Sequence, residues 1–220
     1  MNATEPIRSF YSALAKAYGP QHWWPAKTRF EVIVGAYLTQ NTSWKNVERA
    51  LANLRSAGVL NVKGIREIRQ SDLEQLLRPS GYFRQKAARL KYFISYLDAN
   101  YQGSLRRMFA EPTAKLRAEL LDLNGVGPET ADSILLYAGD HPIFVVDAYT
   151  RRIFDRHDIV PFATTYDAVR NTVERAFSHD APAERARHFN ELHALIVMAG
   201  KNHCNTTAKC AGCPLEPFLP

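Results

Sequence analysis

Apolar residues recur along most of this chain with the spacing of helices. From Arg29 to Gln40 they fall at positions 30, 33, 34, 37 and 38, which form one buried helical face. The same periodicity predicts helices over residues 46–54, 71–77, 85–97, 113–123, 128–138, 166–177 and 182–199. The pattern therefore predicts an all-α protein.

Local signals set the expected ends of two of these helices. Ser71 with Glu74 three residues later is typical of a capping box, and Gly200 is a natural C-terminal stop. Pro142–Val146 is the only apolar, β-branched run, and it is too short to organise a sheet. Strands are therefore not expected to shape the fold.

Composition describes a basic, globular chain. The 220 residues include 28 Lys and Arg against 22 Asp and Glu, which gives a net charge of +6, and 46% are hydrophobic. Such a chain buries a proper core in one or two domains, which excludes disordered and fibrous classes. The usual partner of a basic globular protein is a polyanion such as nucleic acid.

The sequence shows no sign of a membrane-spanning or signal segment. No run approaches the roughly 18 to 20 consecutive apolar residues of a membrane span. The first residues, MNATEPIRSF, lack a basic segment followed by an apolar one. We therefore expect a cytoplasmic protein without membrane contact.

All 3 cysteines, Cys204, Cys210 and Cys213, lie close together near the C-terminal end. An odd, clustered set is not a secreted disulfide framework. The C-x5-C-x2-C spacing beside His203 suits a metal or iron–sulfur site, whose thiolates must converge from one short loop.

The most informative stretch joins two predicted helices through Gly125-Val126-Gly127. The two glycines permit positive φ and close approach of a ligand, Val126 can fill the core, and Pro128 suits the first turn of the next helix. Unpaired N–H groups at such a turn can bind a phosphate oxygen without reading base sequence. The hairpin therefore indicates contact with a nucleic-acid backbone, through Gly125, Val126, Gly127 and Thr130.

The string L-x-x-L-x-G-V-G-x-x-T-A at 120–131, followed by Val146-Asp147, resembles the helix-hairpin-helix DNA glycosylases of the endonuclease III superfamily. The Gly81–Ala87 turn and the cysteine loop resemble two further landmarks of that family. The resemblance implies a two-lobed, all-α fold: a six-helix lobe at 26–140, and a lobe built from 1–25 plus 141–220. The base pocket is then expected between the lobes.

Asp147 is the catalytic residue that the resemblance implies. From the residues alone it is the N-cap of a helix beginning at Ala148, and both roles are compatible. Cleavage of an N-glycosidic bond builds positive charge on the sugar, so a fixed anion beside C1′ stabilises the transition state and can orient or deprotonate water.

Glu129 stands where bifunctional members of the superfamily carry a lysine that forms a Schiff base. A carboxylate cannot form an imine, and no lysine lies within 125–131. We therefore expect a monofunctional enzyme that leaves an abasic site. Glu129 itself is expected to be a solvated first-turn acid.

Three tryptophans narrow the expected substrate. Trp23 and Trp24 lie in His22-Trp23-Trp24-Pro25, and Trp44 follows Leu38-Thr39-Gln40-Asn41-Thr42. Adjacent tryptophans are usually core or interface residues. These segments, however, resemble those of bacterial 3-methyladenine DNA glycosylases, in which aromatic rings hold the flipped base, and a cationic alkylpurine stacks well on such rings.

Polar residues at two turns are candidate DNA contacts. The resemblance places Gln40 or Asn41 in the gap left by an extruded nucleotide, with helix-end capping as the alternative. Arg84 and Lys86 are candidate phosphate contacts, as are Arg151 and Arg152, although an exposed basic residue is most often only solvated.

The cysteine loop departs from the family pattern, because no fourth cysteine follows Cys213. Three alternatives remain: a [4Fe–4S] cluster with an unusual fourth ligand, zinc held by the cysteines and His203, or no metal. We favour a structural metal, because three converging thiolates without one are prone to oxidation.

Together these observations predict a monofunctional glycosylase that removes alkylated purines such as 3-methyladenine. Its expected partner is double-stranded DNA with damaged bases, bound by a monomer that is nucleoid-associated in a bacterium. The alternatives are an endonuclease III-like enzyme for an oxidised, deaminated or mismatched base, and a non-catalytic helix-hairpin-helix DNA-binding protein.

Overall fold

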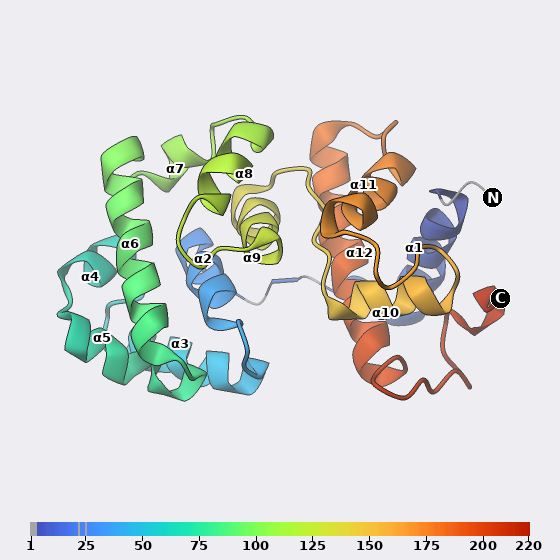
Figure 1. Cartoon of the computed structure of the whole chain (residues 1–220), viewed down its shortest axis with the longest axis horizontal. Coiled ribbons are helices and arrows are strands. Elements are labelled where there is room, and N and C mark those ends of the chain that lie inside the picture. The colour runs from blue at the N-terminus through green and yellow to red at the C-terminus, as the bar shows by residue number, and fades with distance from the viewer. Residues whose placement is uncertain (1–3, 22, 25) are drawn as a thin grey trace. The chain divides into compact units, whose positions relative to one another are not determined.

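Helices provide the regular structure of the computed structural model, which describes residues 4–21, 23–24 and 26–220 (Figure 1). Within those residues no strand forms, and the only β-type pairing is an isolated bridge between Cys204 and Ala208. The predicted all-α class is confirmed. No described helix is both long and apolar enough to cross a bilayer.

The chain divides into two compact units, each described here by itself. The terminal unit comprises Met1–Pro25 and Asp140–Pro220, and the central unit comprises Ala26–Gly139. The boundary expected from the sequence was residue 140. The chain therefore leaves the terminal unit after its first helix and returns to it after the hairpin.

The central unit, whose residues are all described, contains eight α-helices rather than the expected six. The two additional helices are one turn or slightly longer, and each begins at a side-chain cap, Asn61 or Ser104, that the apolar periodicity did not reveal. The helices are α2 (Arg29–Leu38), α3 (Trp44–Ser56), α4 (Val62–Glu67), α5 (Gln70–Leu77), α6 (Phe83–Tyr101), α7 (Leu105–Met108), α8 (Thr113–Leu121) and α9 (Pro128–Ser133). A 3-10 turn, η1 (Arg78–Ser80), precedes α6, and a π-helical segment, η2 (Ile134–Ala138), continues α9.

Helix α2 is the core of the central unit. Every residue from Phe30 to Leu38 is buried, so the helix is enclosed on all sides rather than on one face. Thr28 caps its first turn through the amide of Glu31, and the buried Glu31 carboxylate pairs with Arg55 of α3. The first turn of α2 is therefore fixed by a cap and by a buried ion pair.

The terminal unit is built around α12 (Pro182–Asn202), which contacts α1 (Thr4–Tyr18) and α10 (Ala148–Arg156) (Figure 1). Helix α11 (Tyr166–Ala176) covers α1, and a 3-10 turn, η3 (Glu216–Phe218), lies near the C-terminus. Buried rings of Phe10, Phe144, Phe154, Phe177 and Phe189 form much of the core.

Two expected helix boundaries differ in the structure. Gly200 does not stop α12. It lies inside the helix because Tyr149 of α10 packs against it, so closely that a Cβ would lie 2.2 Å from the tyrosine ring. The capping box of Ser71 and Glu74 does not form either: α5 begins at Gln70 after Arg69, and the Ser71 hydroxyl contacts Asp72.

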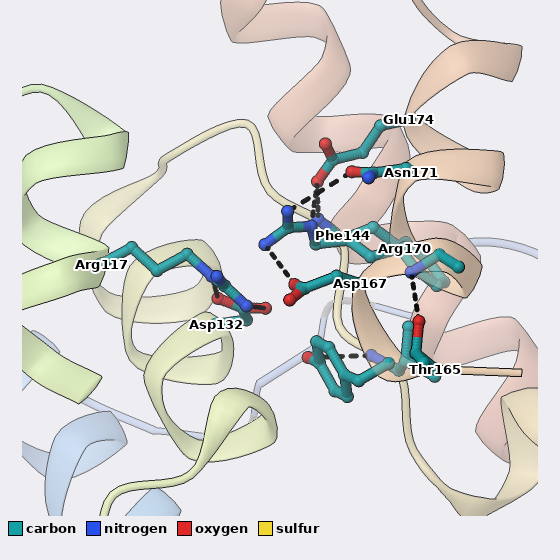
Figure 2. A network of polar contacts seen from close by, with 11 residues as sticks. Arg117, Asp132, Phe144, Thr165, Asp167, Arg170, Asn171 and Glu174 are labelled. Carbon is teal, nitrogen blue, oxygen red and sulfur yellow. Dashed lines mark hydrogen bonds and ion pairs between the residues drawn. The ribbon is translucent and has the colours of Figure 1, made fainter.

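The apolar run Pro142–Val146 is extended without joining a sheet. Side chains of α11 bind two of its amides. Phe144 N–H donates to Glu174 Oε1 at 3.0 Å (Figure 2). Val146 N–H donates to the Tyr166 hydroxyl at 3.2 Å. Arg170 holds Glu174 in turn, at 3.6 Å. This buried strap ends at Asp147, whose position it sets.

Candidate active site and DNA-binding surface

Asp147 is the N-cap of α10, as expected. Its Oδ1 accepts hydrogen bonds from the Thr150 backbone amide at 2.7 Å and from the Thr150 hydroxyl at 2.9 Å. The carboxylate is 14% exposed, so it is mostly enclosed yet open to a ligand. Because both described hydrogen bonds converge on Oδ1, Oδ2 is the oxygen best placed to act on a substrate.

His193 of α12 faces that second oxygen, and sequence reasoning did not single it out. Its Nε2 lies 3.8 Å from Asp147 Oδ2, and the ring packs edge-on against Phe144. Burial lowers the pKa of His193 below its usual value although the charge of Asp147 opposes the shift. The ring beside this oxygen therefore favours its neutral form. The one available signal was a polar residue inside the apolar run of α12.

The hairpin between α8 and α9 adopts the expected tight turn. Gly125 has φ +76°, whereas Gly127 has φ −92°, so the expectation of positive φ is confirmed at the first glycine and wrong at the second. Val126 is buried and Pro128 occupies the first turn of α9. A buried pair between Arg117 Nε of α8 and Asp132 Oδ1 of α9, at 2.7 Å, ties the two helices together (Figure 2).

Gln40 binds the hairpin from the end of α2. Its Nε2 donates to the Gly125 carbonyl and to the Thr130 hydroxyl, both at 3.0 Å, and its Oε1 accepts from Arg89 Nη1 at 2.8 Å. The cap of α2 is Thr39. The capping alternative therefore does not describe Gln40, whose described bonds instead position the hairpin.

Asn41 and Tyr82 are exposed and both have left-handed backbones, with φ of 53° and 45°. A left-handed conformation is strained for a bulky residue such as Tyr82, which is 67% exposed and directly precedes α6. Arg84, in the first turn of α6, is 81% exposed. Asn41 and Arg84 stay predicted DNA contacts, and Tyr82 joins them as a residue that the sequence pattern alone did not distinguish.

The prediction that Lys86 contacts phosphate is wrong. The side chain is buried, and its ammonium group donates to the carbonyls of Leu38 at 2.9 Å and Ser80 at 2.7 Å. Lys86 therefore joins the end of α2 to the turn before α6. The reason is its place on the inner face of α6, beside Ala87 and Leu90, which a charge count along the sequence does not show.

Lys86 predicts a pH dependence of stability. Burial lowers its pKa to about 8, from an ordinary value of 10.5. Between pH 8 and 10.5 the unfolded chain still binds a proton that the folded protein has released. The free energy of unfolding therefore rises with pH over this range, as the cost of burying the charged amine is lost. We expect the free energy of unfolding of the wild type to rise, relative to Lys86→Met, by about 3 kcal/mol over that range. Denaturant unfolding of both proteins at pH 7.5 and 10.5 measures it, and a constant difference would contradict the prediction.

The three tryptophans lie in different units. Trp23 and Trp24 belong to the terminal unit, where both are half-buried and their rings lie 6.0 Å apart, and Trp44 begins α3 in the central unit. Lys201 Nζ lies 5.5 Å from the Trp23 ring centre. That these rings form one base pocket stays a prediction. His22 and Pro25 of the same segment lie outside the described residues.

The cysteine loop does not fit the predicted metal. Cys204, Cys210 and Cys213 line one small cavity with His203 and Glu216. Among the described residues, no three His, Cys, Asp or Glu side chains converge as ligands of an ion. The preference for a structural metal at these cysteines and His203 is therefore unsupported, and no chemistry is assigned to one.

Two arginines hold the loop to α10 instead. Arg156 donates to Cys204 Sγ at 3.0 Å and to the carbonyls of Asn205 and Thr206, both at 2.9 Å. Arg152 Nε donates to the Cys204 carbonyl at 3.2 Å. Arg151 likewise binds the Thr164 carbonyl, at 2.6 Å. Arg151 and Arg152 thus have structural roles in this unit.

Because a guanidinium organises the loop, we expect Arg156→Gln to lower the free energy of unfolding by about 2 kcal/mol through lost charged hydrogen bonds. Cys210→Ser is the matched comparison and is expected to cost less than about 0.5 kcal/mol, since Cys210 is partly exposed. A loop that depended on a bound metal would give the reverse order, because loss of a ligand also loses the metal. Chemical denaturation of the two variants measures both free energies of unfolding and so distinguishes the two possibilities.

Known proteins resemble this chain over nearly its whole length. A protein of Methanocaldococcus jannaschii assigned as a DNA repair glycosylase is 45% identical over 99% of this chain and 97% of its own length. The crystal structure of the 3-methyladenine DNA glycosylase of Helicobacter pylori bound to 1,N6-ethenoadenine is 31% identical, with a TM-score of 0.77 over 91% of this chain and 98% of that one.

An endonuclease III trapped as a covalent intermediate with DNA shares the fold, at 21% identity, with a TM-score of 0.80 over 100% of this chain and 96% of that one. The profile described as "HhH-GPD superfamily base excision DNA repair protein" matches residues 34–179, which include the hairpin and Asp147. The resemblance to this superfamily, noted from the hairpin and the aspartate, is thereby confirmed. This chain belongs to the HhH-GPD superfamily of base excision DNA repair glycosylases.

Proposed function

We propose that this DNA glycosylase hydrolyses the N-glycosidic bond of alkylated purines such as 3-methyladenine. The observation that carries the proposal is the W-W-P segment with Trp44, in a chain that is 31% identical to the 3-methyladenine DNA glycosylase of H. pylori over 91% of its length. Half-buried indole rings suit a flat cationic base.

An alkylated purine needs little help to leave. 3-Methyladenine in DNA carries a positive charge, so the base departs neutral when the N-glycosidic bond breaks, and no general acid is required. The enzyme must still stabilise the positive charge that develops at C1′ of the sugar in the transition state. The Asp147 carboxylate is the anion that we assign to that charge.

In the proposed reaction the oxygen of a water molecule bonds to C1′ while the bond from C1′ to the purine nitrogen breaks. The water proton passes to Asp147 Oδ2 and then to solvent, and DNA with an abasic site remains. Thr150 donates two hydrogen bonds to Oδ1, and the ring of His193 lies 3.8 Å from Oδ2. Asp147 orients and deprotonates the water, and His193 is a positioning residue.

The absence of strand cleavage is part of the proposal. Glu129 is an exposed residue in the first turn of α9, at the place where bifunctional relatives are expected to carry a nucleophilic lysine. Within residues 125–131, all of which are described, no amine is present to form a Schiff base. The buried ammonium of Lys86 is committed to two backbone carbonyls.

A base-release assay tests the substrate. The protein is incubated with methylated duplex DNA, and in parallel with duplexes that contain uracil, hypoxanthine or thymine glycol, and the liberated bases are separated by chromatography. We expect 3-methyladenine to be released at least tenfold faster than any of the others. Preferential release of a deaminated or oxidised base would replace the alkylpurine assignment with the endonuclease III-like alternative. Release of no base from any duplex would favour a DNA-binding module.

A further inference from the structure

An open groove of about 580 Å³ lies on the central unit beside the hairpin. Its walls come from one face of α6 and from the residue before Gly125, and they consist of Gln85, Ala88, Arg89, Tyr92 and Asn124. Arg89 is the only charged residue among them. The groove is therefore a positive, hydrogen-bonding surface with one exposed aromatic ring, that of Tyr92.

The Arg89 side chain is fixed in place by the hairpin. It lies so close to Gly125 that a Cβ on that glycine would fall 2.0 Å from Arg89 Nε and 2.2 Å from Cζ. Its Nη1 donates to Gln40 Oε1 at 2.8 Å, and Gln40 in turn holds the Gly125 carbonyl. Only a glycine permits this contact, so the requirement for Gly125 includes space for Arg89 as well as its positive φ.

The guanidinium of Arg89 has no carboxylate partner among the residues that the structure describes. Its partner is the neutral amide of Gln40, and it forms no ion pair in the part of the chain that the structure describes. Many other arginines of the central unit do pair with carboxylates, including Arg55, Arg66, Arg69 and Arg117. A half-buried, immobilised guanidinium without a counterion is well suited to bind an external anion, because little side-chain entropy is lost on binding.

We propose that Arg89 is a phosphate-binding residue of this enzyme and that the groove it lines holds the sugar–phosphate backbone of one DNA strand. The remaining donors on Arg89 bind a non-bridging phosphate oxygen, with Gln85 and Asn124 as neighbouring hydrogen-bonding groups. The inference rests on the DNA binding of the superfamily and is independent of which lesion is removed. Arg89 would then add a positively charged group to the phosphate-binding backbone amides of the hairpin.

Salt-dependent binding tests the proposal. Binding of a fluorescent, undamaged duplex is measured by anisotropy between 0.05 and 0.5 M NaCl for the wild type and for Arg89→Gln, Arg89→Lys and Arg106→Gln. Each phosphate contact contributes about 0.9 to the slope of log affinity against log salt. We expect Arg89→Gln to reduce the slope by about 0.9 and to weaken binding about eightfold at 0.1 M NaCl. Arg106, exposed on α7, is the matched control and should keep the wild-type slope.

Arg89→Lys separates charge from hairpin structure. If Arg89 binds phosphate, the lysine variant keeps the slope within about 0.3 of the wild type, although its affinity falls because the bond to Gln40 is lost. If Arg89 only supports the hairpin, both Arg89 variants weaken binding equally with an unchanged slope. That result, or an equal loss of slope in Arg106→Gln, would overturn the proposal. Because the duplex is undamaged, failure of the alkylpurine assignment leaves this test intact.

Discussion

Asp147→Asn abolishes most base release while leaving the fold and DNA binding intact. An asparagine has nearly the same shape, and its Oδ1 can still accept the hydrogen bonds of the Thr150 amide and hydroxyl, so α10 keeps its cap. What is lost is the negative charge beside the developing cation at C1′. Removal of one such electrostatic group costs about 100- to 1,000-fold in rate, or about 3 to 4 kcal/mol.

Single-turnover release of 3-methyladenine measures this effect without interference from product release. Asp158→Asn is the matched control: it removes one carboxylate just after the same helix, at an exposed position with φ 52° where asparagine fits well. The control should retain the wild-type rate within about twofold. An Asp147→Asn protein that releases base within about threefold of the wild type would show that another group provides the charge.

Trp44→Leu lowers the rate of 3-methyladenine release by about tenfold or more. Stacking of a nucleic-acid base on an aromatic side chain contributes about 1 to 3 kcal/mol, and the positive charge of an alkylated purine adds a cation–π contribution. Leucine retains the apolar character of the half-buried position at the start of α3 but has no π-face. The loss should therefore appear as slower release at saturating protein.

Trp44→Phe provides the comparison that identifies stacking as the cause. A phenyl ring retains a π-face, so we expect its rate to stay within about threefold of the wild type. Binding of undamaged duplex should be the same for both variants, because no base is flipped there. Equal losses in the leucine and phenylalanine variants would mean that Trp44 has only a packing role.

Helix content was the part of the fold that local pattern could predict. Periodic apolar residues identify α6, α11 and α12 because each of these helices buries one face, and they identify α2 although its other faces are buried too. The short helices α4 and α7 bury one residue each, Ile65 and Met108, so they leave no periodic pattern. Their caps at Asn61 and Ser104 were the only local sign of them.

Tertiary contacts decided the features that the pattern missed. Gly200 continues α12 because the ring of Tyr149 needs the space of a missing side chain. The apolar run 142–146 was expected to form no sheet, but the side chains that bind its amides, Glu174 and Tyr166, could not be named from the sequence. Contacts between residues far apart in sequence have no local signature, which is why neither set of contacts followed from propensity.

The candidate site also contains residues that the local sequence identifies and residues that only tertiary contacts identify. Asp147 and Gly125 belong to motifs in which residue type and spacing are sufficient, so the sequence identified them. Lys86, Arg89 and His193 depend on which face of a helix each side chain occupies and on what lies opposite. Lys86 points to buried carbonyls, Arg89 to a hairpin glycine, and His193 to Asp147. Residue type and charge predicted a phosphate contact for Lys86, which is wrong, and predicted no role for Arg89 or His193.

Hydrolysis at Asp147 without strand cleavage is best tested by the state of the DNA strand. Methylated duplex is incubated with excess wild-type protein, and each sample is divided before electrophoresis, with one half heated in alkali to break abasic sites. The account predicts breaks that accumulate with time after alkali, and intact strands in the untreated half. Breaks in the untreated half would show that an amine of this chain forms a Schiff base, and intact strands in both halves would show that no base is removed.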